Sequence, residues 1–237
     1  MALILHRYYS YALTECDSMT VIIPEEKFPG KTFPVLWLLS PLGTDHTGWQ
    51  RFGSAENLAD EKGYIVVIPD LKLSYGQNML YGLKYFDMLT KELPEIIQDY
   101  YPADIECQII AGAEEGAYAA LYAALNTTLY KTVILLSCGS ITDETSFHGF
   151  ESEAANVFGT NTPTELQGTD KDLFETLISA NSQTIPQIIL SYSDKDKYAA
   201  SAKQLSNHLK KTGKGTVILS EHPQTWTDWF LTIKNIL

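Results

Sequence analysis

Residues 108–121, with the sequence QIIAGAEEGAYAAL, decide the fold. Residues 109–111 are an apolar run that favours a buried strand, residues 112–116 form a turn bounded by glycines, and an alanine-rich stretch that favours a helix follows. A strand, a tight turn and a helix in this order are the context of the nucleophile elbow, G-x-S-x-G. Both glycines are present, but Glu114 stands at the central position. We expect Glu114 to lie at a strained turn and to face a pocket.

Short apolar runs alternate with helical stretches along the chain. Runs that are apolar on both faces are typical of buried strands in a parallel sheet. The expected strands are residues 35–39, 64–68, 108–111, 132–136, 187–191 and 216–220, and the expected helices are 54–61, 85–101 with a kink at Pro94, 116–125, 199–211 and 226–237. Residues 3–11 and 19–23, joined by a turn at 15–17, are expected to form an antiparallel edge. The order predicts a doubly wound, mostly parallel α/β sheet in a single domain over residues 1–237.

One segment departs from this alternation. Residues 138–172 are polar, are rich in glycine and lack a long strand. An excursion between a core strand and the next helix is a common position for an active-site lid. We therefore expect a small lid-like insertion here, and a disordered surface loop is the alternative.

Composition excludes several classes of function. The chain has 29 acidic and 17 basic residues, a net charge of −12, and would be repelled by nucleic-acid phosphates. No apolar run approaches the roughly 20 residues of a membrane-spanning helix, and residues 1–10 do not resemble a secretory signal. Cys16, Cys107 and Cys138 have neither disulfide-framework nor zinc-site spacing, and the last two are expected to be buried thiols. We expect a cytoplasmic protein without a metal or another cofactor.

Several segments resemble the short-chain acyl hydrolases of the esterase D type, which include tributyrin esterases and S-formylglutathione hydrolases. Besides the glycine-bounded turn, they are residues 38–49 (LLSPLGTDHTGW), 59–69 (ADEKGYIVVIP) and 81–102 (YGLKYFDMLTKELPEIIQDYYP), with parts of a lid at 158–159 and 170–174. They occur in the family's order and span nearly the whole chain. The resemblance implies an α/β-hydrolase fold and, for members with an intact site, serine hydrolysis of small acyl esters and thioesters.

The residues that would perform this hydrolysis are replaced. The reaction needs a serine nucleophile, a histidine base and an acid that orients the histidine. The resemblance puts Glu114 at the nucleophile position and Gln224, which cannot relay a proton, at the base position. The acid falls on Lys195 without gaps and on Asp196 with a shift of one residue. His222 is the alternative base, if the loop before the last helix is rearranged.

The loop that would help to bind an oxyanion is also altered. The family's His-Gly pair is Ser40-Pro41 here, and proline has no N–H group. The backbone N–H groups of Leu42 and Glu115 remain as the two expected donors. The losses of serine, histidine and His-Gly on a retained fold together indicate that hydrolysis has been abandoned.

Glu114 is expected to be held as an anion. Its carboxylate should lie at the N-terminus of the helix of residues 116–125, where unpaired N–H groups and the helix dipole stabilise negative charge by about 0.3–1 kcal/mol. The simplest interpretation of Glu114 is a solvated carboxylate at the floor of a relic pocket.

Three functions remain open. The first is a catalytically inactive esterase relative with a ligand-binding or scaffold role, holding a small acyl or carboxylic ligand in the relic pocket. The second is repurposed chemistry with Glu114 as nucleophile and His222 as base, by analogy with the aspartate of haloalkane dehalogenases. The third is residual carboxylesterase activity through another serine, such as Ser40 or Ser137. A homo-oligomer is compatible with each of them.

Overall fold

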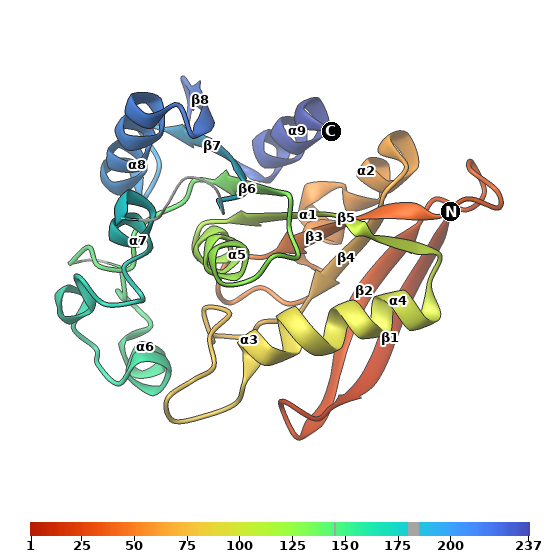
Figure 1. The fold of residues 1–237 in the computed structure, drawn as a ribbon, viewed down its shortest axis with the longest axis horizontal. Coiled ribbons are helices and arrows are strands. Elements are labelled where there is room, and N and C mark those ends of the chain that lie inside the picture. Colours follow the sequence, from red (N-terminus) through yellow and green to blue (C-terminus); the bar gives the residue numbers. More distant parts are fainter. Residues whose placement is uncertain (145, 180–184) are drawn as a thin grey trace.

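The computed structural model describes residues 1–144, 146–179 and 185–237 (Figure 1). At its centre is a twisted sheet with the strand order β1-β2-β4-β3-β5-β6-β7-β8. The strands are β1 (Ala2–Ser10), β2 (Glu15–Ile23), β3 (Phe33–Leu39), β4 (Ile65–Pro69), β5 (Ala103–Ala113), β6 (Thr132–Leu136), β7 (Gln187–Ser193) and β8 (Gly215–Ser220). The β1–β2 and β2–β4 pairs are antiparallel, and the other neighbouring pairs are parallel. The predicted parallel sheet with an antiparallel N-terminal edge is confirmed.

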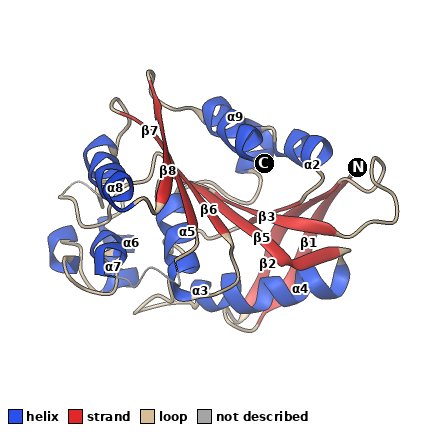
Figure 2. Cartoon of the chain, turned by 45° about the horizontal axis from the view of Figure 1, so that its top comes forward, coloured by secondary structure: helices blue, strands red, loops and turns tan. Residues whose placement is uncertain are grey.

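Helices cover both faces of the sheet (Figure 2). They are α1 (Gly48–Gly53), α2 (Ala55–Lys62), α3 (Tyr85–Asp87), the π-helical turn η1 (Met88–Glu92), α4 (Leu93–Tyr100), α5 (Glu115–Asn126), α6 (Glu151–Phe158), the 3₁₀ turn η2 (Pro163–Leu166), α7 (Leu173–Ser179), α8 (Ala199–Thr212) and α9 (Trp226–Ile236). On one face, α1, α2 and α9 bury Trp49, Leu58 and Trp229. The other face packs against α4, α5 and α8. Among the described residues, none of the helices is long and apolar enough to cross a bilayer.

Two local predictions are wrong for identifiable reasons. β2 begins at Glu15, so the turn after β1 occupies residues 11–14 instead of 15–17, and Thr14 adopts the positive φ (54°) that closes it. Cys107 is exposed, not buried. β5 starts earlier than expected, and its register with β3 shifts between Pro34 and Val35, which leaves residues 105–107 without partners on β3. Cys107 therefore lies in an irregular part of the strand.

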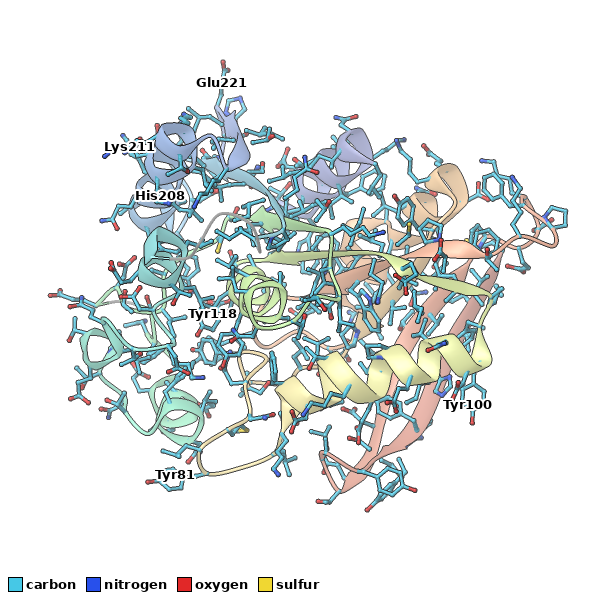
Figure 3. All side chains as sticks on the ribbon, viewed as in Figure 1. Tyr81, Tyr100, Tyr118, His208, Lys211 and Glu221 are labelled. Atoms are coloured by element: carbon cyan, nitrogen blue, oxygen red, sulfur yellow. The ribbon has the colours of Figure 1, made fainter. Side chains whose placement is uncertain are left out.

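The excursion of residues 138–172 packs against the loop before α3. Within that loop, the N–H groups of Leu80 and Tyr81 donate to α6 carbonyls at 3.0 and 2.9 Å. The rings of Phe147 and Phe158 stack 5.5 Å apart, and Tyr75 contacts both. α6 and this loop lie side by side in Figure 1, and Tyr81 marks the tip of the loop in Figure 3. The described part of the excursion is thus a packed element over the carboxyl end of β6.

Candidate functional site

Glu114 lies at a sharp turn between β5 and α5. β5 ends at Ala113 and the helix begins at Glu115, and between them Glu114 has φ 51° and ψ −116°. A positive φ is costly for a residue with a side chain and persists only where the surrounding structure imposes it. The Glu114 N–H donates to the carbonyl of Leu136 in β6 at 2.9 Å. The predicted strained elbow is confirmed.

The two glycines allow the strand and the helix to approach each other. A Cβ atom on Gly112 would collide with the backbone carbonyl of Gly116. A Cβ atom on Gly116 would lie 2.6 Å from the carbonyl oxygens of both Leu39 and Ser40. Any larger residue would therefore have to displace backbone, which explains the need for glycine at both positions.

The elbow faces a narrow cavity, as predicted. It is small, with a volume of about 10 Å³, which is room for about one water molecule. The lining residues are Glu114, Glu115, Tyr75, Tyr118, Gly139, Ser140, Ile141, Ser146 and Tyr198. Tyr118 projects from the side of α5 that faces the excursion (Figure 3), and its hydroxyl donates to the carbonyl of Lys171 at 3.2 Å. The cavity is therefore closed on one side by residues of the excursion.

The environment of Glu114 disfavours its charge. Burial raises the pKa of the Glu114 carboxyl, the negative charges of Glu115 and Asp196 raise it further, and only Lys197 lowers it. The expectation that the helix N-terminus would dominate is therefore wrong. The first turn of α5 carries the Glu115 carboxylate next to Glu114, and that second negative charge opposes the helix dipole.

The Glu115 carboxylate takes up one of the two backbone donors expected for an oxyanion. Its side chain is buried, and its Oε2 atom lies 3.4 Å from the backbone nitrogen of Leu42, which donates to it. Its Oε1 atom accepts from Lys197 Nζ at 3.2 Å and from the Tyr198 hydroxyl. The predicted Leu42 donor is thus directed at a carboxylate of the chain itself. The sequence predicted a role for the backbone N–H of Glu115 but did not reveal that of its side chain.

Asp196 lies beside Gln224, as a triad acid lies beside its base. Asp196 Oδ1 accepts the backbone N–H of Gln224 at 2.8 Å, and Oδ2 accepts the N–H of Ser193 at 2.8 Å. Lys195 is exposed to solvent. Of the two residues that the alignment left open, the structure brings Asp196 to position 224.

Gln224 is fixed by a network centred on Ser137. Gln224 Nε2 donates to Ser191 Oγ at 2.5 Å, and its Oε1 lies 3.0 Å from Ser137 Oγ. Ser137 Oγ lies 2.8 Å from Asp196 Oδ2 and accepts from Trp229 Nε1 at 3.1 Å. This network holds the acid and base positions together without a histidine. Ser137 was a candidate in the sequence because it lies at the end of a predicted strand. Its hydrogen-bond partners, however, come from distant segments of the chain.

The remaining candidates lie apart from this network. His222 is exposed in the loop between β8 and α9, two residues before Gln224. Ser40 contacts the carbonyl of Asp45 at 3.5 Å and lines a second cavity, which Glu115 also lines. Within the described residues, no group of three or more His, Cys, Asp and Glu side chains is arranged to hold a metal ion.

Glu114→Gln is expected to stabilise the chain at pH 7 by about 0.5–2 kcal/mol, the usual size of a stabilising substitution. Because the pKa of Glu114 is raised on folding, wild-type stability falls as pH rises from the ordinary value of 4.5 through the folded pKa. The amide has no such loss, so the gain should shrink at pH 4. Thermal unfolding at both pH values measures this, with the exposed Glu106→Gln as control. An equal gain in stability at pH 4 and at pH 7 would contradict a raised pKa of Glu114 in the folded chain.

Comparisons with known proteins point to one family. The family model described as "Putative esterase" matches residues 12–221. The S-formylglutathione hydrolase of Paracoccus denitrificans (strain Pd 1222) is 27% identical over 142 residues, which are 51% of this chain and 50% of that protein. The chain thus spans about half the length of this curated relative.

Solved structures share the fold at low sequence identity. The fluorophosphonate-binding serine hydrolase F of Staphylococcus aureus, solved with bound substrate, superposes with a TM-score of 0.86 at 22% identity, over 99% of this chain and 96% of that one. An S-formylglutathione hydrolase from Agrobacterium tumefaciens has a TM-score of 0.78 at 18% identity, with 98% and 91% covered. These likenesses agree with the strand order described above and establish the α/β-hydrolase fold. Because the family model spans most of the chain, the chain belongs to this esterase family.

Proposed function

We propose that this chain is a catalytically inactive member of the esterase family with a ligand-binding or scaffold role. The network around Gln224 carries the proposal, because it occupies the base position with an amide that cannot take a proton from a nucleophile. Asp196, which would orient a histidine in an active relative, is engaged by backbone N–H groups and by Ser137.

Charge at the site also argues against acyl transfer. Attack on an ester creates a negative oxygen, which hydrolases stabilise with N–H donors. Here the Leu42 N–H faces the Glu115 carboxylate, so a developing oxyanion would meet a fixed negative charge. Attack by Glu114 itself would produce an anhydride, and no histidine among the described residues that line the cavity could activate water against it. These features oppose each step of the reaction.

The test uses purified wild-type protein with p-nitrophenyl acetate, p-nitrophenyl butyrate and S-formylglutathione, the last because a relative is named as its hydrolase. The expected rates equal those of buffer and are unchanged in Glu114→Ala. Turnover that disappears in Glu114→Ala would overturn the proposal. Turnover that survives this change but is lost in Ser137→Ala would instead establish residual carboxylesterase activity.

The alternative in which Glu114 attacks an alkyl halide has less support. It requires a histidine to activate water, and His222 is exposed outside the network that surrounds Gln224. Incubation with bromoethane followed by mass spectrometry of the Glu114 peptide tests it directly. A covalent ethyl ester on Glu114 with release of bromide would support this alternative.

A further inference from the structure

We propose that the chain forms a homodimer in which the outer edge of β1 pairs with the same edge of a second copy. β1 is the first strand in the sheet order, and among the described strands it pairs with β2 alone. In Figure 1 it lies at the open margin of the sheet. Its outer edge therefore presents backbone N–H and C=O groups that another strand can pair with. This surface is separate from the elbow, so the inference does not depend on the proposed function.

β1 lacks the devices that keep an edge strand from pairing. Natural edge strands are shortened, bulged, interrupted by proline or protected by charged side chains. β1 has nine residues and no proline, and its register with β2 runs from Ala2 to Ser10 without a break. Arg7 is its one side chain of permanent charge. At the other edge of the sheet, β8 has six residues and is followed at once by the exposed Glu221 (Figure 3). Of the two edges, β1 is the better template for another strand.

One face of β1 adds apolar side chains to this edge. The side chains alternate along the strand, so that Tyr8 is buried, whereas Leu3, Leu5 and Tyr9 on the opposite face are 46%, 59% and 54% exposed. Tyr11, just after the strand, is 83% exposed, and its ring centre lies 5.4 Å from that of Tyr9. Exposed apolar side chains that gather in one place mark an interaction surface.

Tyr100 supplies an exposed ring on the other side of the strand. It lies at the end of α4, beside β1 (Figure 3), and is 71% exposed. Its ring packs edge-on against that of His6, with the ring centres 5.7 Å apart. The edge of β1 is therefore flanked by exposed apolar side chains on both faces of the sheet.

A second copy of β1 is the partner that fits this edge. Antiparallel strands present donors and acceptors to each other in a pattern that a two-fold axis leaves unchanged, so the edge is complementary to itself. The net charge of −12 keeps copies of the chain apart, but β1 contains no acidic residue and one arginine. Two copies therefore repel each other little at this edge. A two-fold axis perpendicular to the sheet would bring the Leu3, Leu5 and Tyr9 side chains of both copies together on one face.

The length of the edge sets the strength of the expected contact. Nine residues at about 3.4 Å each give a line of contact about 30 Å long. A single pair of strands is a small interface, below the roughly 800 Å² per partner of standard complexes. We therefore expect a reversible dimer with a dissociation constant on the order of 10 μM.

Sedimentation velocity of the full chain, over concentrations that span this value, tests the proposal. We expect the dimer fraction to rise with concentration. Leu5→Lys places like charges close together across the two-fold axis and should raise the dissociation constant about tenfold or more. Leu231→Lys is the matched control, because Leu231 is 45% exposed on α9 and should leave the dimer unchanged. Circular dichroism confirms that both variants are folded.

Amide hydrogen exchange of the wild-type chain locates the contact without relying on any variant. Exchange in β1 should slow as the concentration rises, whereas exchange in β8 should stay the same. A chain that remains monomeric at every concentration would overturn the proposal. A dimer that is unaffected by Leu5→Lys, or one that protects β8 and not β1, would overturn it as well, since the contact would then lie elsewhere.

Discussion

The triple variant Glu114→Ser/Glu115→Ala/Gln224→His is expected to cleave p-nitrophenyl acetate about 10³-fold faster than wild type, the scale of a restored nucleophile–base pair. A serine at position 114 would inherit the elbow and its strained backbone. A histidine at 224 would find an acid already in place, because Asp196 Oδ1 lies 2.8 Å from the backbone nitrogen of that residue. Removing the Glu115 carboxylate frees the Leu42 N–H for the oxyanion.

The partial variants separate these contributions. Members of a triad act as a unit, so Glu114→Ser and Gln224→His alone should each stay at background. Their combination should remain weak while Glu115 opposes the oxyanion. The altered Ser40-Pro41 loop suggests Pro41→Gly as the third change, but the contact between Glu115 and Leu42 identifies Glu115 as the better target. Values of kcat/KM for the variant series provide the measurement, with circular dichroism as the folding control. An inactive but folded triple variant would show that the pocket has changed beyond these residues.

Gly112→Ala is expected to destabilise the chain by about 4 kcal/mol or more, at the extreme of single substitutions. The new Cβ atom would collide with the backbone carbonyl of Gly116, which cannot move without displacing α5 from β5. Gly149→Ala is the matched control, since Gly149 has a φ of 87° but open space around its Cβ position. Its cost should be about 1 kcal/mol, the conformational penalty alone. Urea unfolding of both variants measures the difference. Similar costs for the two would contradict the tight packing of the elbow.

Local sequence patterns predicted most of the fold. Apolar runs predicted the strands because buried parallel strands are apolar on both faces, and the spacing of Gly112 and Gly116 predicted the elbow because close approach requires glycine. The exposure of Cys107 was not predictable in this way. It depends on a register shift at Pro34/Val35 in β3, about 70 residues earlier in the chain.

The site was predictable only in part. The turn at Glu114 follows from a short motif, and the family resemblance assigned the base position to Gln224. The choice between Lys195 and Asp196 required the folded loop, since adjacent residues point in different directions and sequence alone allows either register. The role of the Glu115 side chain depends on Leu42, which belongs to a different loop. Contacts of this kind arise only when the sheet brings its loops together at one edge.

The contact between Glu115 and Leu42 has an evolutionary consequence. Under the proposed function, a lineage that carries this internal anion cannot regain esterase activity through single substitutions that each increase fitness. Restoring serine alone gives a nucleophile without a base, restoring histidine alone gives a base without a nucleophile, and removing Glu115 alone breaks its contacts with Lys197 and Tyr198 without benefit. Each first step is neutral or harmful, so selection has no gradual path back. Under the proposed function, the Glu115 carboxylate therefore makes the loss of ester cleavage difficult to reverse, and descendants of this chain would specialise in functions that do not require it.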